Sequence, residues 1–271
     1  MGVEMVRAVV AGSAGRMGSR IIHMIQQDPE VSLAGAYERS DHPAVGEDAG
    51  ERVGLGRLGV PVAGTPEEVI SAGDVLIDFT APEAALTGIR AAASWGKAAV
   101  IGTTGLGGEV LEEVLELGER IPVVLAPNMS VGVNLMFRIA AEMARALGDD
   151  YDVEILETHH RFKKDAPSGT ALKLAERLAE ALGRELEDAA VYQRRGMIGE
   201  RGRKEIGIQA LRAGDVTGEH TVVFGGMGER LELTHKAHNR DNFARGALRA
   251  ARWVVNRHPG TYDMQDVLGL K

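Results

Sequence analysis

The segment from residue 157 to residue 172, ETHHRFKKDAPSGTAL, combines two adjacent imidazoles, several cations and a Ser-Gly-Thr turn that opens a helix. Histidine is the side chain whose ordinary pKa lies closest to neutrality, so a histidine here is a plausible general acid. Lys163 supplies a point charge for a carboxylate, or a proton. Exposed N–H groups at the helix start, Ser168-Gly169-Thr170, suit another carboxylate. The segment therefore predicts a site that binds a carboxylate-bearing substrate and protonates it.

Two other interpretations of this segment stay open from the residues alone. The run His159–Lys164 also reads as a solvated basic loop on an acidic protein. Adjacent His159 and His160 could mark a metal site, but no clear Asp, Glu or Cys partners stand at ligand spacing, so we expect no metal. His159 and Lys163 are four residues apart, which places them on one face of a helical turn, although an extended loop can also bring them together.

A glycine-rich turn near the start of the chain predicts a dinucleotide site. Residues 12–18, GSAGRMG, lie between a predicted strand, Val6–Ala11, and a helical pattern that is followed by a second predicted strand, Val31–Tyr37. The glycines fall as G-x-x-G-x-x-G, which by itself is also compatible with an ordinary tight turn. Between a strand and a helix, however, successive backbone N–H groups and the helix N-terminus can hold a pyrophosphate.

Glu38 and Arg39 stand where cofactor choice is usually made. Glu38 ends the second predicted strand, twenty residues after Gly18, which is the usual position of a carboxylate that binds the adenosine ribose. A carboxylate favours NAD, whereas an adjacent arginine can pair with a 2′-phosphate or stack on adenine. The pair predicts use of either cofactor; the alternative is a surface ion pair.

Two further loops are expected to face the cofactor. Gly102-Thr103-Thr104-Gly105 and Ala126-Pro127-Asn128-Met129 each follow a predicted parallel strand. Ligands of such sheets bind beyond the carboxyl ends of the strands. Either loop alone would be routine turn chemistry.

The order of elements predicts two domains. Apolar strands at 6–11, 31–37, 75–79, 98–101 and 122–125 alternate with helices, which indicates a parallel sheet covered on both faces. After Asn128 the pattern changes to helices at 131–147 and 169–182 and extended stretches at 153–158, 205–213, 220–224 and 230–236. Because the last three stretches are separated by Gly-rich turns without helices, we expect an antiparallel or mixed sheet. A helical stretch at 242–256 precedes the tail.

Composition narrows the class of protein. The formal net charge of the 271 residues is −8, which gives no support to nucleic-acid binding. There is no cysteine, so disulfides and thiolate zinc sites are excluded. No window approaches 18 consecutive apolar residues and the start lacks a signal-peptide pattern, so we expect no membrane span and a cytoplasmic location.

The sequence resembles the dihydrodipicolinate reductase family nearly end to end. The resemblance rests on AGSAGRMG at 11–18, GTTG at 102–105, APNMSVGVN at 126–134 and the 159–172 segment, with RAGD at 212–215, GEHT at 218–221 and THKA at 234–237. It implies a Rossmann-like domain, residues 1–128 completed by 241–271, and an α+β domain, residues 129–240, for substrate binding and tetramerisation. A homotetramer using NADH or NADPH is thus expected.

The resemblance also assigns roles to residues. His159 would be the proton donor and Lys163 the second catalytic group. The substrate's carboxylates would be held by His160, Lys163, Ser168, Gly169 and Thr170. The cofactor would be lined by Gly12, Ser13, Ala14, Gly15, Arg16, Met17, Glu38, Arg39, Gly102, Thr103, Thr104, Ala126, Pro127, Asn128 and Met129. The sequence departs from the family pattern at two positions. It has Phe162 where some members carry another histidine and Met129 where phenylalanine is frequent, and both changes are modest.

The function so implied is NAD(P)H-dependent reduction of 4-hydroxy-tetrahydrodipicolinate, a small cyclic dicarboxylate, in the diaminopimelate route to lysine. One alternative is another two-domain NAD(P) oxidoreductase acting on an amino or hydroxy acid, which need not carry the segment from His159 to Thr170. A second alternative is a non-catalytic NAD-sensing protein, which would have no reason to keep His159 and Lys163 beside a carboxylate-binding turn.

Overall fold

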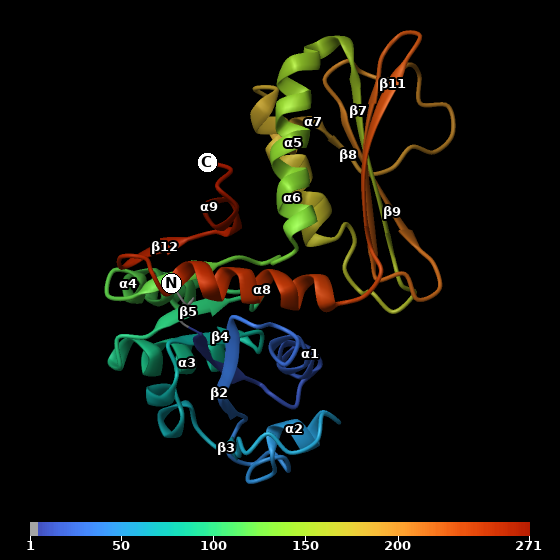
Figure 1. Cartoon of the computed structure of the whole chain (residues 1–271). Helices are drawn as coiled ribbons and strands as arrows, with labels where there is room; N and C mark the ends of the chain where they lie inside the picture. The colour runs from blue at the N-terminus through green and yellow to red at the C-terminus, as the bar shows by residue number, and fades with distance from the viewer. Residues whose placement is uncertain (1–4) are drawn as a thin grey trace. The chain divides into compact units, whose positions relative to one another are not determined.

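The computed structural model describes residues 5–271, which form two compact units (Figure 1). The first unit consists of the described residues up to Val131 together with Arg240–Lys271, and the second of Gly132–Asn239. Within the described residues, no helix is long and apolar enough to cross a membrane.

A parallel sheet forms the centre of the first unit. Its strand order is β12-β6-β5-β4-β1-β2-β3, and every pair of neighbours runs parallel. The strands are β1 (Val6–Ala11), β2 (Val31–Tyr37), β3 (Val62–Ala63), β4 (Val75–Asp78), β5 (Ala98–Ile101), β6 (Pro122–Leu125) and β12 (Gly260–Tyr262). The predicted parallel sheet is confirmed, with β3 and β12 as additions at its two edges.

Helices cover both faces of this sheet, which explains why its strands are apolar throughout. Along β1, Ala8 and Val10 face one core and Val9 and Ala11 the other. The first core is closed by α1 (Arg16–Ile25), α8 (Asp241–Val254) and α9 (Met264–Leu268), and the second by α3 (Pro82–Ser94) and α4 (Gly108–Gly118). Helix α8 therefore packs beside α1, although the two are distant in sequence (Figure 1).

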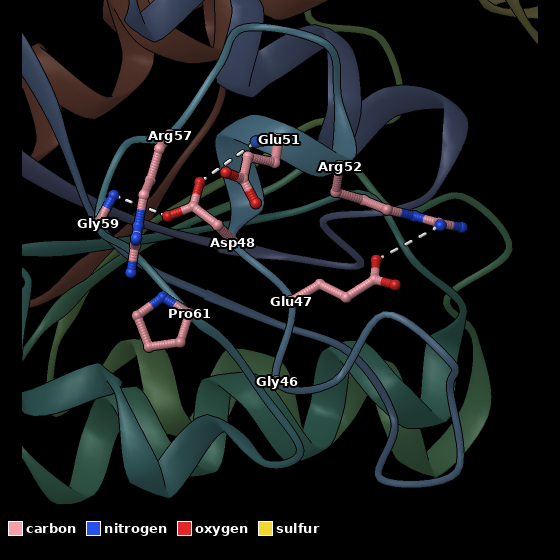
Figure 2. Close-up of a pocket in the computed structure, with 8 residues that line it drawn as sticks. All are labelled: Gly46, Glu47, Asp48, Glu51, Arg52, Arg57, Gly59 and Pro61. Atoms are coloured by element: carbon pink, nitrogen blue, oxygen red, sulfur yellow. Dashed lines mark hydrogen bonds and ion pairs between the residues drawn. The ribbon is translucent and has the colours of Figure 1, made fainter.

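The segment from Ser40 to Gly59 is organised around Asp48. This residue caps the short helix α2 (Ala49–Arg52), and its two oxygens accept five backbone N–H groups, from Gly50, Glu51, Leu58, Gly59 and Val60. Asp48 is one of the residues that line a pocket of about 730 Å³. Figure 2 shows its carboxylate between Glu51 and Gly59, which belong to the two arms of the loop. Two short 3-10 helices, Pro66–Glu68 and Ile70–Ala72, lead on to β4.

The second unit has a mixed sheet of order β11-β10-β7-β9-β8. Its strands are β7 (Asp152–His159), β8 (Ala190–Val191), β9 (Ile206–Arg212), β10 (Gly218–Gly225) and β11 (Arg230–Ala237). β7 runs parallel to β9 and antiparallel to β10. The helices are α5 (Val131–Leu147), α6 (Gly169–Ala181) and α7 (Leu186–Ala189), with a 3-10 turn at Gly148–Asp150. The expectation of a mixed sheet is confirmed.

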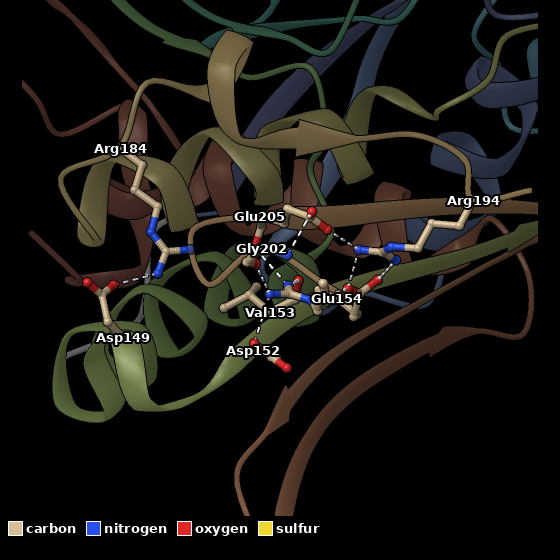
Figure 3. Close-up of polar contacts among 9 residues, drawn as sticks. Asp149, Asp152, Val153, Glu154, Arg184, Arg194, Gly202 and Glu205 are labelled. Carbon is tan, nitrogen blue, oxygen red and sulfur yellow. Dashed lines mark hydrogen bonds and ion pairs between the residues drawn. The ribbon is translucent and has the colours of Figure 1, made fainter. Parts of the chain in front are cut away.

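The two faces of this second sheet differ in character. Val153 and Ile155 of β7 are buried in a core that α5 and α6 share with the sheet. On the opposite face Leu156 is 38% exposed. Glu154 on that face belongs to an ion-pair network, in which Arg194 lies between its carboxylate and that of Glu205 (Figure 3).

Candidate active site

His159 is the last residue of β7 and projects to the same face as Glu157, because alternate residues of a strand share a face. Its Nδ1 lies 2.5 Å from Oε2 of Glu157. The Glu157 side chain is fully buried, while that of His159 is 12% exposed. The strand therefore presents an imidazole at its end with a carboxylate behind it.

Besides His159, Glu157 is held by groups from two other places in the chain. The guanidinium of Arg212, at the end of β9, donates to both carboxylate oxygens at 3.0 Å. The backbone N–H of Ser168 donates to Oε1 at 3.1 Å. Burial alone would raise the pKa of the Glu157 carboxyl, but the bonds from Arg212 and His159 outweigh it and hold that pKa below its usual value. Glu157 therefore stays an anion.

The electrostatic surroundings of His159 act in opposite directions. Burial lowers the pKa of His159 below its ordinary value, and the neighbouring charges of Lys163 and Arg212 lower it further. Glu157 offsets part of this by stabilising the imidazolium. The result is an acid that holds its proton less tightly than a histidine in water.

His220 of β10 is a site residue to which the sequence assigned no role. Its ring meets that of His159 edge to face, with centroids 5.2 Å apart, and its Nε2 lies 3.0 Å from Oγ of Ser168. Burial lowers the pKa of His220 to about 3, so its ring is neutral. No local sequence pattern predicts this contact, because it arises from the pairing of β10 with β7, which are distant in sequence.

The Ser-Gly-Thr turn begins α6, as the sequence predicted. Ser168 is the N-cap, and its Oγ accepts the backbone N–H of Ala171 at 3.2 Å. Ser168 is buried, whereas Gly169 is exposed and Thr170 half-buried. The N-terminal turn of a helix suits an anion, because the helix dipole is positive at that end.

Lys163 and His160 lie on the loop between β7 and α6. The N–H of Lys163 donates to the carbonyl of His160, so residues 160–163 form a turn that follows the strand rather than a helix carrying His159. The ammonium of Lys163 bonds both oxygens of Asp165 at 2.9 Å. A ligand carboxylate that binds Lys163 must therefore compete with Asp165 for the ammonium group. His160 is half-buried, and its Nδ1 is buried without a hydrogen-bond partner.

In the first unit, the glycine turn joins β1 to α1 in the way the sequence indicated. Gly12 has φ +58°, a conformation that favours glycine, and a Cβ at Gly18 would lie 2.1 Å from the carbonyl oxygen of Gly12. The turn is therefore closely packed on the start of α1. Gly15 is the N-cap and has no side-chain cap, so the first N–H groups of α1 are available to an anion.

Glu38 and Arg39 take different roles beside this turn. Glu38 accepts the N–H of Ala14 at 2.9 Å and so ties the end of β2 to the glycine turn. Arg39 is exposed and paired with Asp41 at 3.1 Å. The carboxylate is thus part of the turn's framework, while the guanidinium lies on the surface.

A pocket of about 320 Å³ brings three predicted loops together. It is lined by Arg16 and Met17 of α1, by Gly102, Thr103 and Thr104, and by Pro127, Asn128 and Met129, with Phe79, Thr80, Arg240 and Phe243 in addition. Of the predicted cofactor residues, Ser13 and Ala126 are buried beside these loops rather than in the lining. The rule for strand ends could have found Phe79 and Thr80, because they directly follow β4.

Asp78, the last residue of β4, fixes two of these loops. Its Oδ1 accepts the hydroxyls of Thr80 and Thr103, at 2.8 and 2.7 Å, and the N–H of Thr80 at 2.9 Å. Burial raises the pKa of the Asp78 carboxyl. The turn that Asp78 makes with Thr80 also explains why the strand ends one residue before the predicted Phe79. No group of three or more His, Asp or Glu able to hold a metal occurs among residues 5–271.

The sequence matches two family models, the N-terminal part of dihydrodipicolinate reductase over residues 6–129 and the C-terminal part over residues 132–268. A 4-hydroxy-tetrahydrodipicolinate reductase of Syntrophus aciditrophicus is 56% identical over 267 residues, 98% of this chain and 100% of that protein. One of Syntrophobacter fumaroxidans is 55% identical with the same coverage.

Solved structures are also similar to this chain over nearly its whole length. A dipicolinate-bound dihydrodipicolinate reductase from Paenisporosarcina sp. TG-14 superposes with a TM-score of 0.76 at 26% identity, covering 97% of this chain and 98% of that one. An amine dehydrogenase from Mycobacterium smegmatis, 18% identical with a TM-score of 0.59 over 94% of each chain, shares the fold alone.

Proposed function

The chain belongs to the dihydrodipicolinate reductase family, and we propose that it reduces 4-hydroxy-tetrahydrodipicolinate to tetrahydrodipicolinate in the diaminopimelate route to lysine. The reaction consumes NADH or NADPH and one proton and releases water. The observation that carries the proposal is the grouping, in the second unit, of His159, Lys163 and the start of α6 at Ser168. These groups suit a proton donor beside a dianionic ring.

The cofactor is assigned to the first unit. The N–H groups at the start of α1 would hold the pyrophosphate, and Glu38 with Arg39 would face the adenosine ribose. The pocket between Met17, Thr104 and Asn128 would take the nicotinamide. When bound there, the dihydronicotinamide supplies the hydride.

The second unit would bind the substrate and deliver the proton. The first turn of α6, from Ser168 to Thr170, would hold one carboxylate and Lys163 the other, and His160 would contribute to the anchor. His159 would then donate a proton from Nε2, since its Nδ1 is engaged by Glu157. Orientation and charge are the contributions of these side chains.

We also propose that the chain assembles as a homotetramer through the face of the second sheet that its helices leave uncovered. Leu156 of β7 and Leu211 of β9 are 38% and 48% exposed. Apolar side chains gathered on an otherwise polar sheet face are typical of a surface that meets another copy. Light scattering of the purified protein tests whether it is a tetramer. We also propose that the enzyme is located in the cytoplasm.

A coupled assay tests the proposed activity. Dihydrodipicolinate synthase generates the unstable substrate in place, and the absorbance of NADH is followed after this protein is added. We expect oxidation that depends on both enzymes. Oxidation that persists without the synthase, or none with it, would contradict the proposal. An amino or hydroxy acid that supports turnover in place of the synthase product would favour the alternative oxidoreductase.

A further inference from the structure

We propose that Glu157 is a positioning residue that fixes the tautomer of His159, so that Nε2 is the ring nitrogen that carries the reactive proton. The inference rests on the proposed function, because it specifies how the general acid of that reaction is oriented. It concerns a residue for which the sequence had suggested no role.

The contact between the two side chains carries the inference. A carboxylate only accepts hydrogen bonds, so the 2.5 Å contact requires a proton on Nδ1 of His159. A neutral ring held in this way has its lone pair on Nε2, and a second proton must therefore bind there. Nε2 points toward Gly218, where an added Cβ would lie at 3.0 Å, so the absence of a side chain leaves room at the reactive end.

Glu157 can impose this orientation because it is itself fixed. It is fully buried and receives two bonds from Arg212 and one from the N–H of Ser168. Arg212 also donates to the carbonyl of Asp165 at 2.6 Å. A single carboxylate thus joins the acid on β7 to the residues that begin α6, so the proton donor and the carboxylate-binding turn share one support.

A purely structural role for the same residues makes a different prediction. If Glu157 and Arg212 only stabilise the fold as a buried ion pair, removal of either charge should have similar consequences. In the positioning role they act oppositely on His159, since Glu157 favours the imidazolium while Arg212 and Lys163 disfavour it. His220, whose ring meets that of His159 edge to face, stays neutral.

The test compares Glu157→Gln with Arg212→Gln in the full-length protein. We measure the dependence of kcat on pH and, by ¹⁵N NMR without substrate, the protonation of the two His159 nitrogens. Glu157→Gln should lower kcat by about 10²-fold or more, within the range for loss of a general acid, with a smaller change in KM. Its fall in kcat with rising pH should move to lower pH, and Nε2–H should become the main neutral tautomer.

Arg212→Gln should move the same fall in kcat to higher pH and leave Nδ1–H as the neutral tautomer. Shifts of equal sign in both variants, or an unchanged tautomer in Glu157→Gln, would overturn the inference. If Glu157→Gln does not fold, Glu157→Asp replaces it. The shorter side chain keeps the negative charge but draws back from Nδ1, so it too should raise the Nε2–H population, and an unchanged population would count against the inference.

Failure of the proposed function can be told apart from failure of this inference. A wild-type enzyme that does not oxidise NADH in the coupled assay would contradict the proposed function. The tautomer measurement needs no substrate and tests the role of Glu157 whatever the outcome of that assay.

Discussion

Gly218 lies so close to His159 that a Cβ added to it would stand 3.0 Å from Nε2 of the imidazole. This separation is tighter than an ordinary van der Waals contact, so an alanine there would crowd the atom assigned to proton donation. Gly218→Ala should lower kcat/KM at least tenfold, which corresponds to about 1.4 kcal/mol of transition-state stabilisation. Steady-state kinetics measure this effect directly.

Gly225→Ala in the same strand is the matched control for Gly218→Ala. Its added Cβ would meet only Cβ of Asp152 at 4.0 Å, an ordinary contact. We expect normal kinetics and a similar melting temperature. A Gly218→Ala enzyme with kinetics as normal as this control would show that Nε2 does not face the substrate.

Cofactor choice should respond in opposite directions to two exposed residues. Arg39→Ala should reduce kcat/KM for NADPH more than for NADH, because the 2′-phosphate loses a cation. Asp41→Asn releases Arg39 from its 3.1 Å pair and should improve NADPH relative to NADH. Both effects should be modest, within about tenfold, because the pair is exposed to solvent. Steady-state kinetics with NADH and with NADPH measure both effects. If the ratio of kcat/KM for NADPH to kcat/KM for NADH is the same in the two variants, Arg39 is not part of the cofactor site.

The presence of two carboxylate-binding subsites should be detectable by comparing how strongly two pyridine carboxylates inhibit the enzyme. Pyridine-2,6-dicarboxylate should compete with substrate, whereas pyridine-2-carboxylate should bind at least tenfold more weakly because one subsite stays empty. Lys163→Met should abolish most of this difference. Equal inhibition by the two compounds would contradict a pocket for two carboxylates.

Stability should depend on the ionisation of Asp48. Hydrogen bonds from the backbone N–H groups of Leu58, foremost, and of Glu51, Gly50 and Gly59 lower its pKa from 3.8 to about 2. A lowered pKa in the folded state means that the stabilisation is present above pH 3.8 and is lost as pH falls toward 2. Asp48→Asn should therefore lower the melting temperature near neutrality and make less difference in acid.

Glu51→Gln on the same loop is the control for Asp48→Asn, since Glu51 is exposed. Scanning calorimetry across pH compares the two. If Asp48→Asn and Glu51→Gln melt alike near neutrality, Asp48 does not organise the loop.

Much of the fold could be predicted because local patterns determine it. β1, β2, β5 and β6 have the bounds that their apolar runs predicted, since strands buried on both faces are marked by composition alone. β12 was missed because three residues carry no pattern, and its place beside β6 depends on the return of the chain. The parallel pairing of β7 with β9 is equally a matter of tertiary structure.

The candidate site divides in the same way. His159, Lys163 and Ser168 lie in one segment and could be singled out by residue type. Arg212 reaches Glu157, and His220 reaches His159, only through the pairing of β9 and β10 with β7, which no local pattern reveals. Glu157 stood two residues from His159, and the alternation of a strand could have placed both on one face.

The general-acid role of His159 is tested most directly by kinetics of His159→Gln beside His160→Gln. His160 neighbours His159 in sequence, but its Nδ1 has no hydrogen-bond partner, so it is a matched control outside the pair with Glu157. His159→Gln should lower kcat by about 10²–10⁴-fold with little change in KM or cofactor affinity, and His160→Gln should mainly raise KM. A folded His159→Gln enzyme with wild-type kcat would contradict the account.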